Sequence, residues 1–86
     1  MTTRRREVEL LEMTFDYSRL KGRITEVCGT RKEYANRVKM SYMTLACKLT
    51  NRSQWTQKEI VEACSVLGIT RSEMPDYFFV RTVKNL

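Results

Sequence analysis

The chain has 86 residues, of which 42% are hydrophobic and 30% are charged, a balance typical of one folded domain. It contains no histidine, three glycines and three cysteines, which excludes Ser–His or Cys–His nucleophile pairs, glycine-rich phosphate loops and zinc sites built from four Cys or His ligands. We therefore expect neither an enzyme nor a metal or cofactor, and no apolar run is long enough to span a membrane.

The net charge of +6 is concentrated in one part of the chain. Residues 19–52 contain nine basic and two acidic side chains, whereas the residues before and after them are close to neutral. Basic side chains that meet phosphates release counterions, so such a surplus favours a polyanionic partner. The charge distribution therefore points to nucleic acid.

The first 13 residues are predicted to form an N-terminal arm or to extend the first helix. That helix begins near Asp16, a capping residue that follows Phe15, and Gly29 ends it because glycine adopts left-handed backbone easily. Between these two points, apolar side chains recur at about four-residue spacing, which predicts one buried face. They are Leu20, Ile24, Val27 and Cys28.

The next two predicted helices are joined by a very short connection. One starts at Thr30, whose spacing to Glu33 is that of a capping box, and ends near Lys39. The other starts at Ser41, so only two to four residues link the helices, which forces a sharp angle between them. The small side chain of Ala35 lets the two axes approach. We therefore predict a helix-turn-helix over roughly residues 30–50.

A fourth helix is predicted to start at Thr56, again with the capping-box spacing to an acidic residue. Its core face is predicted to include Ile60, Val61, Cys64 and Leu67. The same pattern begins at Thr70, but Pro75 interrupts it, so we expect a turn at 71–74 and a short helix at 75–79. Residues 79–86 are predicted to form an edge strand or a frayed tail.

The predicted fold is therefore all-α: a five-helix, repressor-like bundle with a central helix-turn-helix and a short C-terminal strand as the alternative to a tail. The predicted division of the chain is an arm at 1–13, a DNA-binding domain at 14–80 and a tail at 81–86. Tryptophan at position 55 is expected to pack in the core rather than to stack on a base.

Four motifs occur in order between Phe15 and Phe79, namely FDYSRLKGRI, CGT, LGI and YFF. Together with residues 30–69 they resemble the phage repressor and Cro class of helix-turn-helix proteins, and more closely a small phage family of Cro-like regulators. The resemblance implies a sequence-specific transcription regulator at a phage or prophage operator. Its recognition helix would span about residues 42–50 and enter the major groove.

The expected DNA contacts follow from this arrangement. Recognition helices read base edges with their N-terminal part, which predicts base contacts from Ser41, Tyr42, Met43, Thr44, Ala46 and Cys47. The resemblance places Arg31 against a phosphate, and the other predicted phosphate contacts are Lys32, Lys48, Asn51 and Arg52. The class often has Gln at the position of Arg31 and Gly at that of Asn51, but asparagine tolerates the left-handed backbone that ends such a helix.

Two functions are the main candidates, and a third, the antitoxin of a toxin pair, would require a toxin gene alongside. A regulator bound to double-stranded DNA would be a homodimer, because one small module contacts too little DNA for tight specific binding. The alternative is a protein-interaction module that binds a repressor or another phage regulator, because Tyr42 and Met43 offer apolar contact and little bidentate hydrogen bonding. Either protein would act in the cytoplasm of a bacterial host, where its cysteines stay reduced.

Overall fold

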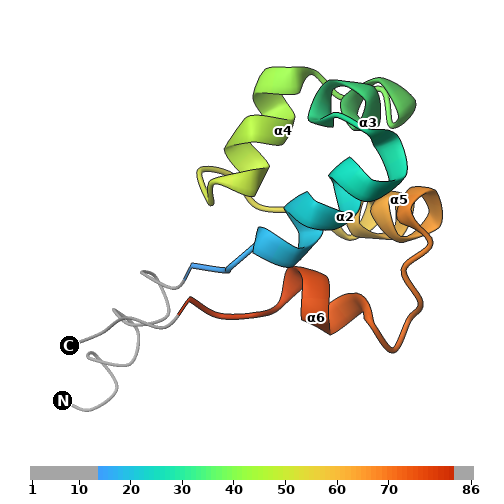
Figure 1. Ribbon diagram of the computed structural model, residues 1–86. Helices are drawn as coiled ribbons and strands as arrows, with labels where there is room; N and C mark the ends of the chain where they lie inside the picture. Colours follow the sequence, from blue (N-terminus) through green and yellow to red (C-terminus); the bar gives the residue numbers. More distant parts are fainter. Residues whose placement is uncertain (1–13, 83–86) are drawn as a thin grey trace, which may run out of the picture.

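The computed structural model describes residues 14–82 and shows five α-helices in this range (Figure 1). They are α2 (Ser18–Cys28), α3 (Arg31–Arg37), α4 (Tyr42–Leu49), α5 (Gln57–Leu67) and α6 (Met74–Phe78). The predicted all-α class is confirmed. The predicted arm at 1–13 and the end of the predicted tail, 83–86, lie outside the described residues.

Most helix starts lie where the capping residues predict them. The hydroxyl groups of Thr30, Ser41 and Thr56 each accept a hydrogen bond from the backbone N–H three residues later, and Thr56 also forms the full capping box with Glu59. The first start is displaced by one residue, because Tyr17 rather than Asp16 occupies the N-cap position. Asp16 accepts hydrogen bonds from both the backbone N–H and the hydroxyl group of Ser18, and the helix begins at Ser18 itself.

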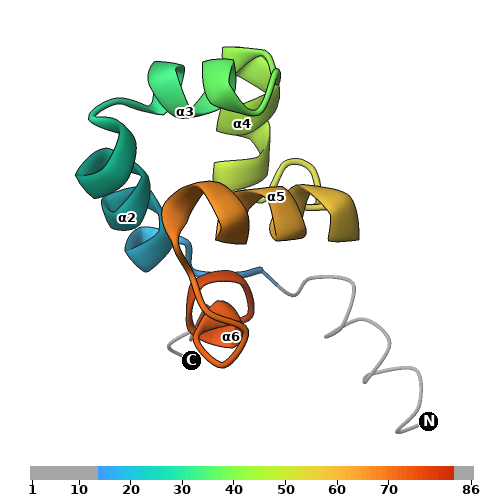
Figure 2. The same ribbon diagram turned by 90° about the vertical axis from the view of Figure 1, so that its right-hand side faces the viewer.

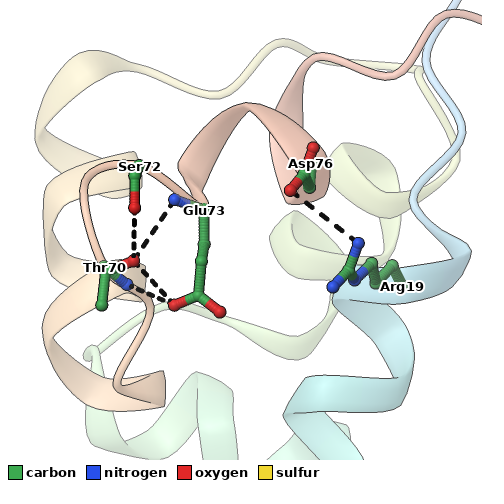
Figure 3. A network of polar contacts seen from close by, with 5 residues as sticks. All are labelled: Arg19, Thr70, Ser72, Glu73 and Asp76. Carbon is green, nitrogen blue, oxygen red and sulfur yellow. Dashed lines mark hydrogen bonds and ion pairs between the residues drawn. The ribbon is translucent and has the colours of Figure 1, made fainter.

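The turn before α6 forms a small polar network (Figure 3). Thr70 donates its backbone N–H to Glu73 Oε1 at 3.1 Å, and Glu73 donates its own N–H to Thr70 Oγ1 at 3.3 Å. Pro75 then lies in the first turn of α6, where a missing N–H costs no helical hydrogen bond. Asp76, in the same turn of α6, forms an ion pair with Arg19 of α2, with 3.9 Å between Asp76 Oδ2 and Arg19 Nη1. The predicted turn and short helix are thus confirmed to within one residue.

The core forms around α2, which contacts α3, α5 and α6. Leu20 and Ile24 of α2 are completely buried, and Trp55 packs edge-on against Phe78 and Tyr17, at ring-centroid distances of 5.2 and 6.4 Å. Tryptophan 55 is therefore a packing residue, as expected. The buried hydrophobic residues are Tyr17, Leu20, Ile24, Cys28, Tyr34, Ala35, Leu45, Leu49, Ala63, Leu67, Ile69, Tyr77 and Phe78.

One predicted core residue of α5 points outward. Val61 is 66% exposed, while Ala63 is completely buried. Because each residue rotates a helix by about 100°, position 61 lies off the stripe that Ile60, Ala63 and Leu67 form.

The two ends of the described chain lie side by side (Figure 1). Asp16 donates its backbone N–H to the carbonyl oxygen of Val80 at 2.7 Å, and Thr82 donates to that of Thr14 at 3.0 Å. We call residues 14–16 and 80–82 the terminal pair. It contains a single antiparallel β-bridge, between Phe15 and Arg81, so the predicted strand is reduced to one bridge within the described residues.

Two views at right angles show the arrangement of the helices. In both, α3 and α4 form one end of the molecule, α6 lies at the other, and α2 and α5 lie between them (Figure 1 and Figure 2). None of the helices in residues 14–82 is long and apolar enough to cross a membrane.

Candidate functional site

The turn between α3 and α4 sets the direction of α4. Lys39 has a φ of 56°, and it donates its backbone N–H to Asn36 O at 3.2 Å while Met40 donates to Ala35 O at 2.8 Å. These two bonds form a Schellman motif, which usually has glycine at the left-handed position that Lys39 occupies here. Ala35 is 3% exposed where the helices meet, as its small size predicts. The two central helices and their short turn are therefore present.

The N-terminal half of α4 faces solvent. Met43 is 71% exposed and Tyr42 is 45% exposed. Ser41 and Thr44 are exposed as well, and Ser41 caps the helix by accepting the N–H of Thr44 at 3.1 Å. We call these four residues the α4 surface. It is the exposed part of the predicted base-reading set.

The remaining two residues of that set are less accessible. Ala46 and Cys47 are half-buried, because the C-terminal half of α4 packs against the core through Leu45 and Leu49, which are fully or almost fully buried. Cys47 is a free thiol, as are Cys28 and Cys64. The exposed residues of the predicted base-reading set thus lie at the start of the helix.

Lys48 is placed differently from the prediction. Its side chain is 8% exposed, and its Nζ lies 2.8 Å from Glu59 Oε1 and donates to the carbonyl oxygen of Gln54 at 2.8 Å. Burial alone would raise the pKa of Glu59, but hydrogen bonds from Lys48 and Thr56 outweigh it and hold that pKa below its usual value. Lys48 follows Leu45 by three residues and therefore shares its inward face. It is not available to a phosphate.

Asn51 is also engaged within the molecule. Its φ of 65° confirms the predicted left-handed end of α4. Its side-chain Oδ1 accepts the backbone N–H of Phe15 at 2.9 Å, and its Nδ2 donates to the carbonyl oxygen of Phe15 at 2.8 Å. The amide therefore uses its oxygen and one of its N–H donors within the molecule. Nothing in the local sequence signals this tie, because Phe15 is 36 residues away.

The other predicted phosphate contacts remain accessible. Arg31, Lys32 and Arg52 are exposed, and so is Lys39 in the turn. A hollow of about 250 Å³ opens between this turn and the start of α5, a feature that the sequence did not predict. Its lining includes Lys39, Met40, Lys58 and Glu62. Within residues 14–82, no group of three His, Cys, Asp or Glu side chains could hold a metal ion.

Comparisons with known proteins find a phage regulatory protein to which the chain is similar. It is similar to the modulator of repression (MOR) of the temperate bacteriophage TP901-1 from Lactococcus lactis, known from a solution structure. The two share 40% sequence identity with a TM-score of 0.68, over 76% of this chain and 88% of that one. No curated protein matches significantly.

These findings confirm the broader part of the expected resemblance, which is kinship with a phage regulatory protein of small helical fold. Neither the solved structure nor the family model is described as Cro or as a repressor. The family model is described as a protein of unknown function (DUF739) and matches residues 13–81, so the chain belongs to this family.

Proposed function

We propose that the chain is a modulator of repression, which binds a repressor through the α4 surface and changes its affinity for DNA. The observation that carries the proposal is the exposure of Tyr42 and Met43, which lie next to each other at the start of α4. Large apolar side chains held in solvent on a rigid element mark contact sites, and aromatic residues and methionine are enriched at protein interfaces.

The chemistry of the α4 surface favours protein over DNA. Residues 41–47 read SYMTLAC and include no Arg, Lys, Asn or Gln, the side chains that most often form hydrogen bonds with base edges. Lys48 and Asn51, which follow this stretch, bind other parts of the chain. The similarity to a protein described as a modulator of repression supports the same choice.

The positive charge around this surface would assist such an encounter. Arg31, Lys32 and Lys39 are exposed on α3 and the turn. Charges near an interface mainly raise the rate of association and select partners of opposite sign. The proposed partner surface is therefore acidic at its rim and apolar at its centre. This role places the chain in the cytoplasm of the bacterial host, where a repressor acts.

The test uses the purified repressor encoded in the same genome as this chain. Replacing both Tyr42 and Met43 with alanine should weaken binding about 30-fold or more in a calorimetric titration, the effect expected of central interface residues. Val61→Ala is the matched control, because Val61 is also an exposed apolar residue but lies on α5. It should bind like the wild type. Equal binding by the double variant, with all three proteins folded, would contradict the proposal.

A second candidate is direct DNA binding as a homodimer, favoured by the accessible cations Arg31, Lys32 and Arg52 and by the capped, exposed start of α4. Contacts with phosphates make affinity fall steeply with salt. Titration of a labelled duplex from beside the gene, in a salt series, separates the two roles. A specific, salt-dependent complex with this chain alone supports DNA binding, whereas an effect only in the presence of the repressor supports modulation.

A further inference from the structure

We propose that Asn51 is a positioning residue, which couples the α4 surface to the terminal pair so that partner binding at one is felt at the other. The binding part of this proposal rests on the proposed function. The coupling itself rests on the hydrogen bonds of Phe15, which lies in the middle of residues 14–16.

The segment 14–16 is bonded on both of its edges. Phe15 directs its N–H and its carbonyl oxygen to the side chain of Asn51, at 2.9 and 2.8 Å. On the other side, the carbonyl oxygen of Thr14 accepts the backbone N–H of Thr82, and the backbone N–H of Asp16 is donated to Val80. Alternate backbone groups of an extended segment point in opposite directions, so the segment lies between the Asn51 amide on one side and residues 80–82 on the other. The amide takes the place of a neighbouring strand.

Besides the core packing of Leu45 and Leu49, α4 is held by polar side-chain contacts, and those that reach beyond the helix lie toward its C-terminal end. Lys48 binds Glu59 and the carbonyl oxygen of Gln54, and Asn51, two residues beyond the helix, binds Phe15. The α4 surface is at the opposite end. Eight residues span about 12 Å, so a tilt of about 5° at the tied end moves the α4 surface by about 1 Å. The Asn51 tie therefore helps to fix where Tyr42 and Met43 are presented.

The identity of residue 51 supports this role. Its left-handed backbone is the conformation that glycine adopts most easily at a helix end, with asparagine as the second choice. Glycine would satisfy the backbone alone. Only a residue with an amide side chain can give and accept the two bonds to Phe15, so asparagine meets both requirements.

This allows a substitution that removes the tie and spares the helix end. In Asn51→Gly, hydrogen exchange of the Phe15 amide, followed by NMR, should accelerate about tenfold or more, because its acceptor is lost. The variant should still fold, because glycine suits the left-handed backbone, and its melting temperature should fall only by the small amount that two lost hydrogen bonds cost. The Kd for the purified repressor should rise about fivefold, the lower end of typical coupling.

Coupling between two regions acts in both directions, so repressor binding to the α4 surface should change amide exchange in the terminal pair. A merely structural role of Asn51 would not produce this change. If the two regions are coupled, repressor binding must slow exchange of the Phe15, Asp16 and Thr82 amides in the wild type. In Asn51→Gly this slowing should disappear. Asn51→Asp keeps an acceptor for the Phe15 N–H but cannot donate, so it should be intermediate. Arg81→Gln, which leaves the backbone bonds of the terminal pair intact, should behave like the wild type.

The outcomes are distinguishable. If Asn51→Gly frees the Phe15 amide and yet binds the repressor with wild-type affinity, the positioning role is overturned. If the wild type itself does not bind the repressor, the proposed function fails, and the coupling is then decided in the free protein. There, Asn51→Gly must also accelerate exchange of the Leu45 amide in α4, and unchanged exchange overturns the coupling. Should Asn51→Gly unfold, the same measurements on Asn51→Asp decide.

Discussion

Lys39 adopts the left-handed backbone conformation, which costs a residue with a side chain about 1–2 kcal/mol. Glycine would relieve this cost and lose about 0.5–1 kcal/mol through the greater freedom of the unfolded chain. Lys39→Gly is therefore expected to raise the free energy of unfolding by about 0.5–1 kcal/mol, measured by urea denaturation. A loss of stability would mean that the lysine side chain supports the turn.

The pair of Lys48 and Glu59 carries a second prediction at this scale. Lys48→Met keeps the length of the buried side chain but leaves Glu59, whose side chain is 22% exposed, without its cation. We expect a loss of about 1–3 kcal/mol in unfolding free energy, because a partly buried charge is left unpaired. Arg37→Met breaks an exposed pair with Glu33 and should cost less than about 0.5 kcal/mol.

The same variant should change the response to acid. The pKa of Glu59 in the folded chain lies below the ordinary value of 4.5, so the folded state binds this proton less readily than the unfolded state. The stabilisation is complete above pH 4.5 and is lost as the pH falls through the lower, folded value. Urea denaturation between pH 6 and about pH 3 should show a shallower acid loss in Lys48→Met than in the wild type. Parallel curves would assign the acid response to other carboxylates.

At the scale of elements, α5 depends on its first turn. Thr56→Ala removes a hydroxyl that accepts the Glu59 N–H at 3.2 Å and breaks the capping box of an 11-residue helix. The expected loss is about 1 kcal/mol in unfolding free energy, measured by thermal or chemical denaturation. Thr56→Ser keeps the hydroxyl and should lose much less. Equal losses from the two variants would assign the effect to the methyl group of threonine.

These elements show how far sequence reasoning reached. The caps at Thr30, Ser41 and Thr56 were predictable because each hydrogen bond lies within four residues of sequence. The roles of Lys48 and Asn51 were not, because their partners Glu59 and Phe15 come together only in the folded chain. Lys48 nonetheless offered a signal: it follows Leu45 by one helical turn, so a buried position could have been expected.

At the scale of the whole molecule, charge is distributed unevenly. Reversing two exposed cations of α3, in Arg31→Glu with Lys32→Glu, should lower the association rate with the repressor about tenfold at low salt, because steering by charge is lost. Arg71→Glu with Arg81→Glu changes the net charge equally, near α6 at the other end of the molecule. Stopped-flow mixing should show little change for this control, and equal slowing would mean that only net charge matters.

The pairing of residues 14–16 with 80–82 has a practical consequence. Because Thr14 and Thr82 are joined by a hydrogen bond, these two residues lie at the same corner of the protein. That corner adjoins α6, whereas Tyr42 and Met43 lie at the end formed by α3 and α4 (Figure 1). Two different dyes, one attached at position 14 and one at position 82, would therefore report directly when the pairing opens.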